Sequence, residues 1–255
     1  MKPDGLPRCP RNIRLTLEYD GTDYVGWEKQ KNGLGIQQVV EEAVERITGE
    51  RPVLNGSGRT DAGVHALGQV ASFTLQNRIA ASDLQRALNA VLPDDVAVTS
   101  AEDVSLFFHA RFSATSKTYR YRLLTGRTPS PLNRREVHHH RAPLDVAAMQ
   151  AAAPLFLGRH DFSAFCREAD RIGDCRRTLH RLDIETDGPF VTFWVAGDGF
   201  LYNMVRIIVG TLIHVGSGKL GIDDVAALLR GGARKSAGPT VPAHGLALVE
   251  VCYPG

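Results

Sequence analysis

The chain has 255 residues, of which 43% are hydrophobic and 23% are charged. This composition is ordinary for a globular protein, and the length suits one large domain or two domains of roughly 100–150 residues each. No apolar run reaches the ~20 residues that a membrane-spanning helix needs, and the amino terminus lacks the apolar stretch of a secretory signal peptide. We therefore expect a cytoplasmic protein that has no membrane partner.

The cysteines and the distribution of charge indicate which class of globular protein this is. Four cysteines are spread along the chain without a C-x-x-C pair, which argues against a disulfide scaffold or a zinc knuckle. Between Arg111 and Arg141 eight basic residues stand against one acid, a net charge of +7 in a chain whose total is +2. Such a run can be a solvated face, but this one also holds two tyrosines and three histidines. The combination favours a polyanion such as RNA as a partner.

The first third of the chain predicts an arm, a strand and a helix. Residues 1–11 contain three prolines and predict a loose arm. Apolar and polar side chains alternate over residues 13–19, as in a half-buried strand. Apolar residues then follow helical spacing over residues 36–47, and Gly49 is a typical helix end.

The middle of the chain continues this pattern. Residues 69–75 predict a strand, and Ser82 with Gln85 forms the capping-box pattern of a second helix. Residues 118–124 predict a further strand, with Tyr119 and Tyr121 on one face and the arginines between them on the other.

The last part of the chain repeats this order of elements. It predicts, in order, a helix over residues 143–156, strands over residues 178–185 and 190–196, an apolar helix over residues 200–215, a helix over residues 222–229 and a strand over residues 246–253. We expect two similar α+β halves, each ferredoxin- or RRM-like, with a mostly antiparallel sheet, helices on one face and a basic cleft between the halves. The boundaries are an arm at 1–11, an N-terminal half at 12–115 and a C-terminal half at 116–255.

One glycine-rich loop carries the chemistry that the sequence offers. It reads Gly56-Ser57-Gly58-Arg59-Thr60-Asp61-Ala62-Gly63. A plain connecting loop is one interpretation. A phosphate-binding loop is disfavoured, since G-x-x-x-x-G-K-[ST] is absent and Asp61 replaces the third glycine of G-x-G-x-x-G. A carboxylate beside an arginine on a loop of this kind suits covalent catalysis.

Arg206 lies in the middle of the apolar helix predicted over residues 200–215. A buried arginine costs several kcal/mol unless a carboxylate meets it. The partner could be any acid of the core, or it could be Asp61, and the residues themselves do not choose. Metal catalysis is disfavoured, because side chains of His138, His139 and His140 alternate in an extended segment and no second set of ligands supports them.

Several motifs together resemble the TruA family of tRNA pseudouridine synthases. They occur in chain order at residues 58–70, 108–114, 119–121, 160–162, 199–206 and 243–246. The first reads Gly-Arg-Thr-Asp-Ala-Gly-Val-His-Ala-x-Gly-Gln-Val, and the matches extend from Tyr19 to Tyr253. Glu28 stands where the family usually has Gln, and Ser57 stands where Ala is frequent.

The resemblance implies a function for particular residues. Asp61 matches the catalytic aspartate that attacks the target nucleotide, and Tyr119 matches a tyrosine that packs on the target base. Arg59 matches an arginine that helps the base leave its stack, and Arg206 matches a basic residue that pairs with the aspartate. The RNA-contacting segment corresponds to Phe108, His109, Ala110, Arg111 and Phe112. The family isomerises uridines 38, 39 and 40 in the anticodon arm of tRNA, works as a homodimer and needs no metal or other cofactor.

Two other functions explain part of the sequence. A non-catalytic protein with two RRM-like sheets would explain the basic stretch, but a carboxylate in its groove would only weaken RNA binding. The RNP1 octapeptide of such sheets is also missing. A carboxylate-dependent hydrolase usually needs two acids close together, and only Asp61 occupies a catalytic setting in the sequence.

Overall fold

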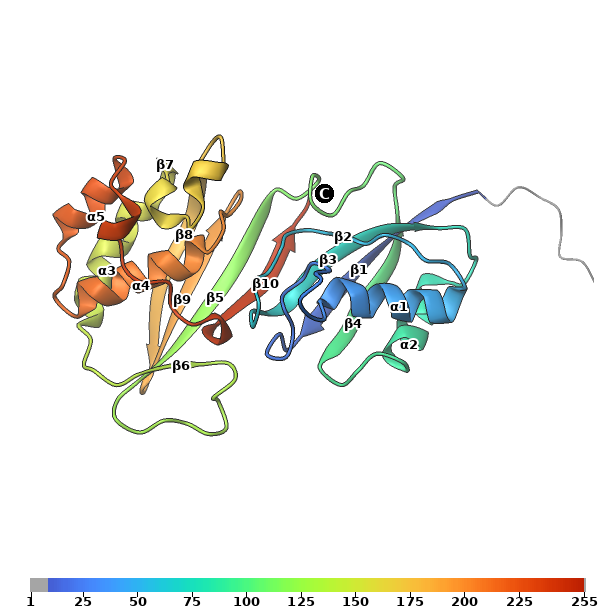
Figure 1. Cartoon of the computed structure of the whole chain (residues 1–255), viewed down its shortest axis with the longest axis horizontal. Helices are drawn as coiled ribbons and strands as arrows, with labels where there is room; N and C mark the ends of the chain where they lie inside the picture. Colours follow the sequence, from blue (N-terminus) through green and yellow to red (C-terminus); the bar gives the residue numbers. More distant parts are fainter. Residues whose placement is uncertain (1–8, 255) are drawn as a thin grey trace, which may run out of the picture. The chain divides into compact units, whose positions relative to one another are not determined.

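The structure of the chain is a computed structural model that describes residues 9–254 and divides into two units (Figure 1). The first unit comprises the described residues up to Ala114 together with Tyr253 and Pro254, and the second comprises Thr115–Cys252. The arm predicted for residues 1–11 lies mostly outside the described residues. Its last residue, Arg11, is already the first residue of a strand, so this strand begins two residues before the predicted run at residues 13–19.

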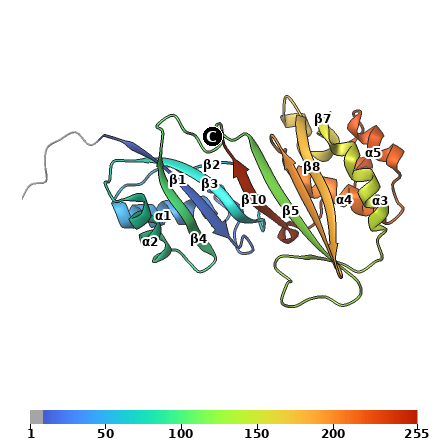
Figure 2. The same cartoon turned by 180° about the vertical axis from the view of Figure 1, so that it is seen from behind.

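The first unit contains two helices on one face of an antiparallel sheet (Figures 1 and 2). Its elements are β1 (Arg11–Tyr19), α1 (Ile36–Thr48), β2 (Asn55–Gly56), β3 (His65–Leu75), α2 (Ala81–Asn89) and β4 (Val96–Val104). Strand β1 pairs antiparallel with β3 on one side and with β4 on the other, and β2 pairs with β3. The spatial order of the strands is therefore β4-β1-β3-β2.

The core of this unit follows from the alternation along β1. Ile13, Leu15 and Leu17 are fully buried, while the residues between them are at least partly exposed. In the register with β3, Leu15 lies opposite Ala71 and Leu17 lies opposite Gln69. A glutamine buried to 0% exposure needs hydrogen-bond partners, and these partners prove to be the loop that carries Asp61.

The second unit also consists of an antiparallel sheet with helices on one face. Its elements are β5 (Ser116–Thr125), β6 (His138–His140), α3 (Val146–Ala152), β7 (Gly158–Asp161), β8 (Arg176–Asp187), β9 (Phe190–Gly197), α4 (Met204–Gly216), α5 (Ile222–Leu229) and β10 (Leu246–Cys252). The strand order is β10-β5-β9-β8-β7, all antiparallel, and β6 pairs in parallel with the end of β5. The helices lie on one face of this sheet, and the opposite face is seen uncovered in Figure 2.

The fold class is confirmed as mixed α+β with mostly antiparallel strands. Among the described residues, none of the helices combines the length and the apolar character needed to cross a membrane. Helix α4 is buried nearly all round, as expected, and only Arg206 and His214 among its residues are partly exposed. It begins at Met204 instead of residue 200, because Asn203 adopts a left-handed conformation, φ 63°, that interrupts the helix.

Several local predictions were wrong. Helix α2 is capped at Ala80 without a side-chain bond, so the Ser82–Gln85 capping box does not form. Gln85 instead donates to the carbonyl oxygens of Val98 and Thr99 in β4. The helix predicted over residues 143–156 is α3 followed by a 3-10 turn, Ala153–Phe156, that contains a proline. Strands β4, β6 and β7 were not predicted.

Candidate active site

Buried hydrogen bonds fix the floor of the loop that carries Asp61. The hydroxyl groups of Tyr19 and Thr60 lie 2.8 Å apart. Gln69 donates from Nε2 to the carbonyl oxygen of Gly58 at 2.9 Å, and Ser57 donates from Oγ to Gln69 Oε1 at 2.6 Å. Burial raises the pKa of Tyr19 to about 12, so its phenol stays protonated and the network stays neutral. The loop is therefore anchored from below by side chains that carry no charge.

A second backbone segment holds the loop from the side. Gly26 and Asp61 form an antiparallel bridge, and the amide of Trp27 donates to the carbonyl oxygen of Thr60 at 3.1 Å. Gly26 has φ +105°, and a Cβ at this position would lie 2.4 Å from the oxygen of Thr60. Only glycine allows so close an approach in this conformation. Asp61 is thus half-buried between two fixed backbones.

The residue before Thr60 forms an ion pair with that second segment. Nε of Arg59 lies 2.5 Å from Oε1 of Glu28, and the Arg59 side chain is 71% exposed. Arg59 was predicted from the sequence as a site residue, but Glu28 was not predicted as its partner. The only indication of this ion pair in the sequence was the carboxylate of Glu28, at a position where the family usually has glutamine.

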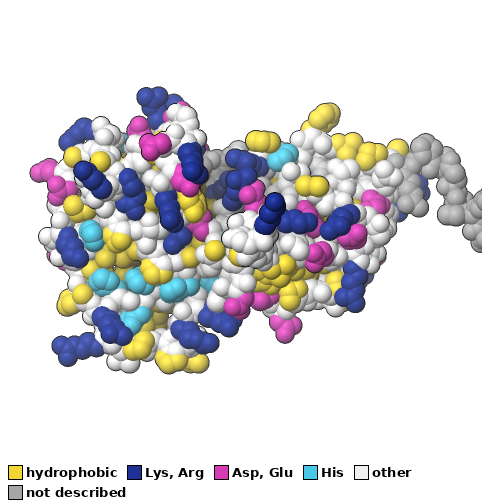
Figure 3. Space-filling view, in the orientation of Figure 1, with side chains coloured by type: hydrophobic (Ala, Val, Ile, Leu, Met, Phe, Trp, Pro, Cys, Tyr) yellow, Lys and Arg dark blue, Asp and Glu magenta, His cyan; other side chains and the backbone are white. Residues whose placement is uncertain are grey.

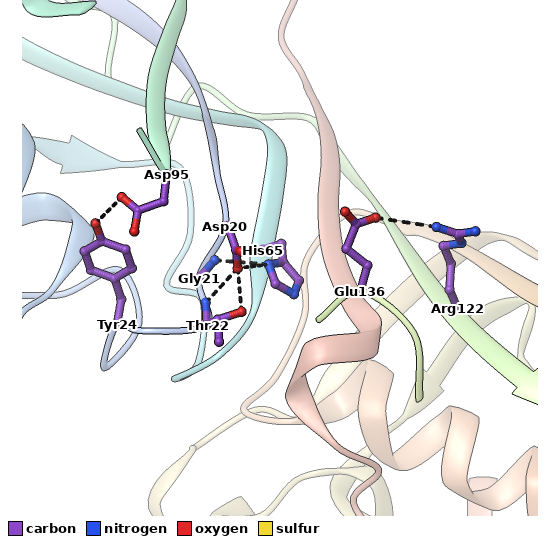
Figure 4. A network of polar contacts seen from close by, with 8 residues as sticks. All are labelled: Asp20, Gly21, Thr22, Tyr24, His65, Asp95, Arg122 and Glu136. Carbon is purple, nitrogen blue, oxygen red and sulfur yellow. Dashed lines mark hydrogen bonds and ion pairs between the residues drawn. The ribbon is translucent and has the colours of Figure 1, made fainter. Parts of the chain in front are cut away.

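The turn that follows β1 is tied to the first residue of β3 (Figure 4). Asp20 Oδ1 accepts hydrogen bonds from the amide and the hydroxyl of Thr22 at 3.0 and 2.5 Å, and it lies 3.0 Å from Nδ1 of His65. The amide of Gly21 donates to the same His65 nitrogen at 3.0 Å. His65 is buried, so its imidazole holds the turn against the end of the Asp61 loop.

The second unit holds Tyr119 and Arg206. Tyr119 in β5 is 7% exposed, and its ring packs against that of Phe200 at an interplanar angle of 79°, with the ring centroids 4.9 Å apart. Arg206 is half-buried in α4, and its Nε donates to the carbonyl oxygen of Val241 at 2.8 Å. A backbone carbonyl therefore satisfies one edge of this guanidinium. The pairing of Arg206 with Asp61 stays a prediction.

The segment Phe108–Phe112 has inward and outward members. The ring of Phe108 packs on that of Tyr253, with the ring centroids 4.9 Å apart. Ala110 is 0% exposed, and its amide donates to Ser72 Oγ. His109 is partly buried, and its Nδ1 accepts the amide of Arg111. Arg111 is exposed, and Phe112 is 77% exposed. RNA contact stays a prediction for the whole segment, in which Arg111 and Phe112 are the exposed residues.

Phe107, which precedes this segment, was not predicted from the sequence. Its side chain is 96% exposed, more than that of any other aromatic residue among the described exposed hydrophobic side chains. The neighbouring Leu106 is 61% exposed. The doublet Phe107-Phe108 was the available signal, since one ring of such a pair can pack inward while the other is left in solvent.

The basic stretch of the second unit alternates as predicted along β5. Tyr119 and Tyr121 are buried, while Arg120 and Arg122 remain partly exposed. Arg122 lies 3.5 Å from Glu136 (Figure 4). In the loop after β5, Arg134 and Arg135 are exposed, and Arg141 is exposed beyond β6. Lys and Arg side chains are spread over the visible face of this unit, above and below a row of histidine side chains (Figure 3).

Two of the three histidines of β6 line a cavity of the second unit. A cavity of about 250 Å³ is lined by His138, His139, Leu124, Val137 and His244, among others. Burial lowers the pKa of His138 to about 4, and the neighbouring histidines act in the same direction. Among the described residues, no three His, Cys, Asp or Glu side chains are grouped so that they could hold a metal ion.

Comparison with known proteins identifies the family. The family model described as tRNA pseudouridine synthase matches residues 16–113 and 152–254. Proteins called tRNA pseudouridine synthase A from Acetivibrio thermocellus and from Geobacter sp. (strain M21) are 47% and 46% identical, over 95% and 96% of this chain and 100% and 99% of theirs. The tRNA pseudouridine synthase A 2 of Clostridium perfringens is 46% identical over 95% of this chain and 100% of its own length.

A solved structure, the archaeal box H/ACA sRNP Nop10-Cbf5 complex, has a TM-score of 0.34 at 15% identity over 88% of this chain and 60% of that chain. A likeness this low carries no argument. The full-length sequence identities and the matching family model do, and they cover both units. The chain belongs to the tRNA pseudouridine synthase family.

Proposed function

We propose that the chain converts uridine to pseudouridine at positions 38, 39 and 40 in the anticodon arm of tRNA, with Asp61 as the nucleophile and without a cofactor. The reaction breaks the N–C glycosidic bond of uridine and forms a C–C bond between the same sugar and base, so nothing is added or lost. The observation that carries the proposal is the family signature around Asp61, combined with full-length similarity to tRNA pseudouridine synthases.

The surroundings of Asp61 support a nucleophilic role. A covalent catalyst has to meet the reacting atom in a fixed geometry. The buried bonds of Thr60 and the backbone bridge to Gly26 keep the main chain of Asp61 in one position. The carboxylate therefore attacks the nucleotide from a rigid base. The atom that it attacks is on the sugar or on the pyrimidine.

Three further residues complete the proposed machinery. Tyr119 packs against the target base with the ring that Phe200 supports from the side. Arg59 helps the uridine to leave its stack, a step that costs a few kcal/mol and needs protein contacts to offset it. Arg206 pairs with Asp61 and favours its ionised form. Arg111 and Phe112 contact the RNA from the exposed side of their loop, and we extend that surface to Phe107.

The element order supports a duplicated architecture. In the first unit β1-α1-β2-β3-α2-β4 gives the strand order β4-β1-β3-β2, and in the second unit β10-β5-β9-β8 is the corresponding order. A β-α-β-β-α-β unit of this kind is ferredoxin-like. We propose that the two halves form a basic cleft for tRNA, that the enzyme is a homodimer and that it works in the cytoplasm, where tRNA is used.

One assay tests this function against its alternatives. The purified protein is dialysed against EDTA and incubated with unmodified tRNA transcripts, and pseudouridine is mapped by carbodiimide treatment and primer extension. We expect new stops at positions 38–40 in transcripts that carry uridine there. Tight tRNA binding without any modification would favour a binding protein. Activity that disappears on chelation and returns with zinc would contradict the cofactor-free reaction.

A further inference from the structure

The ion pair between Glu28 and Arg59 joins the proposed catalytic loop to the segment beside it. Oε1 of Glu28 lies 2.5 Å from Nε of Arg59, and the two side chains are 40% and 71% exposed. Neither residue belongs to the buried network of Tyr19, Thr60 and Gln69. The pair is therefore a separate feature of the surface beside Asp61.

The backbone brings these two residues together independently of their charges. Trp27 donates its amide to the carbonyl oxygen of Thr60, and Gly26 bridges Asp61. Glu28 directly follows Trp27, and Arg59 directly precedes Thr60, so the two side chains start as neighbours across an antiparallel contact. Because main-chain bonds set the distance, the carboxylate meets the guanidinium without having to order either segment.

The contact uses one particular edge of the guanidinium. Arginine presents five N–H groups in a rigid plane, and Glu28 engages Nε, the nitrogen nearest the chain. Among residues 9–254, the structure gives Arg59 no polar partner other than Glu28. The two terminal nitrogens therefore face solvent in a plane whose orientation Glu28 fixes. Such an edge matches the oxygens of an RNA phosphate or of a base.

We propose that Glu28 is a positioning residue that holds Arg59 by its Nε edge and presents the terminal nitrogens to the RNA. The proposal rests on the function proposed above. A mobile arginine would have to lose its rotational freedom at the moment when the uridine is extruded, whereas an arginine held by Glu28 has already lost part of it. Glu28 itself repels the RNA phosphates, so it acts through Arg59 and adds nothing to binding.

The opposite effects on rate and on binding give a sharp test. Glu28→Ala frees the guanidinium and removes a negative charge. We expect the single-turnover rate at saturating enzyme to fall about three- to tenfold, in the lower part of the coupling range for two side chains in contact. The Kd for tRNA should stay equal or become lower, because a repulsive charge is gone. A slower rate with unweakened binding cannot come from a contact that Glu28 makes with the RNA in the bound ground state.

A double-mutant cycle separates positioning from a general effect. Glu28→Ala should not slow the reaction further in an Arg59→Ala background, since there is no guanidinium left to hold. Glu28→Gln keeps an acceptor oxygen in the same place and should return the rate to within about twofold of wild type. Glu45→Ala is the matched control, because Glu45 forms another exposed ion pair, with Arg51 at 3.3 Å, on α1. It should change neither rate nor Kd.

An independent measurement follows the side chain itself. The ¹⁵N relaxation of the Arg59 Nε–H group should report a restricted side chain in the wild type and a mobile one in Glu28→Ala, with the urea midpoint of each variant as the check on folding. A Glu28→Ala enzyme as fast as wild type, an equal loss in the Arg59→Ala background, or unchanged Nε relaxation overturns the positioning role. A wild-type protein that forms no pseudouridine instead refutes the proposed function, and the relaxation experiment still decides whether Glu28 holds Arg59.

Discussion

At the scale of single residues, Asp61 is held by its main chain on both sides. Its carbonyl oxygen accepts the amide of Val64 at 3.1 Å, and its backbone bridges Gly26. Replacing the carboxylate by an amide leaves these bonds in place. We therefore expect Asp61→Asn to fold normally and to bind tRNA within a few-fold of wild type.

Activity should respond quite differently to the same substitution. An amide cannot serve as the nucleophile, so pseudouridine formation by Asp61→Asn should fall below detection in a tritium-release assay on uridine-labelled tRNA. The circular dichroism spectrum and the tRNA Kd serve as controls. Residual activity above a tenth of wild type would remove Asp61 from the covalent step.

Gly26 and Gly49 allow a paired test of how closely the loop is held. Both have positive φ, but a Cβ at Gly49 would meet nothing within 4 Å, whereas one at Gly26 would lie 2.4 Å from the oxygen of Thr60. Gly49→Ala should cost about 1 kcal/mol of stability through its left-handed backbone alone and leave activity unchanged. Gly26→Ala should cost more and should also slow catalysis at least tenfold, because a displacement of about 1 Å is enough for that. Urea midpoints measure the stability of the two variants, and single-turnover rates measure their activity. Equal effects of the two substitutions would show that the Asp61 loop can shift to accommodate the extra Cβ.

At the scale of elements, the loop from β4 to β5 separates structural from exposed aromatic rings. Phe108 packs inward on Tyr253, whereas Phe107 is 96% exposed. Stacking of a base on an aromatic ring is worth about 1–3 kcal/mol by alanine substitution. We expect Phe107→Ala to weaken tRNA binding about fivefold or more in fluorescence anisotropy. Leu106→Ala, which removes an exposed apolar side chain without a ring, should stay within twofold, and equal losses would indicate simple apolar contact.

The histidines of β6 predict an acid-sensitive element in the second unit. The pKa of His138 is lowered from 6.5 to about 4, chiefly by burial and then by repulsion from His244, His140 and His139. Burial also lowers the pKa of His140. Between pH 6.5 and 4 the unfolded chain binds protons at these positions that the folded chain does not. Stability should therefore fall as the pH decreases through this window and level off below it.

The measurement is the urea midpoint at several pH values between 4 and 7. We expect the urea midpoint of His138→Gln to fall less steeply with decreasing pH than that of the wild type. The variant lacks one imidazole whose pKa is lowered by folding. His180→Gln is the control, since His180 is exposed on β8. A decrease as steep in His138→Gln as in wild type would assign the acid sensitivity to other groups.

At the scale of the whole molecule, charge is concentrated in the residues after β5. Arg134, Arg135 and Arg141 are exposed there, in a chain whose net charge is only +2. Each of them that contacts a phosphate should, when changed to Gln, reduce the slope of log Kd against log salt by about one unit. Arg86→Gln, at an exposed position on α2, is the control. Unchanged slopes for all three would make this stretch a solvated face.

The elements that could be predicted are those with a periodic pattern of their own. Apolar side chains alternate with polar ones along β1, and they follow helical spacing along α1. Each of these elements therefore has one apolar face, whichever element packs against it. Strand β4 was missed because its second half is polar on both faces and is extended only through its pairing with β1. The cap predicted for α2 failed for a similar reason, since Gln85 bonds to β4 instead of to its own helix.

The sequence by itself determined the α+β class, the family and Asp61 as the candidate nucleophile, because periodicity and signature motifs are properties of residue order. The tertiary structure alone decided what surrounds that residue. Glu28 and Arg59 are far apart along the chain, and only the main-chain bonds of Trp27 and Gly26 bring their side chains to 2.5 Å. The burial of Gln69 beneath the loop, and the outward turn of Phe107 beside an inward Phe108, likewise depend on which strand or ring lies opposite. A contact of this kind depends on how the backbone brings distant segments together, which no local pattern of residues records.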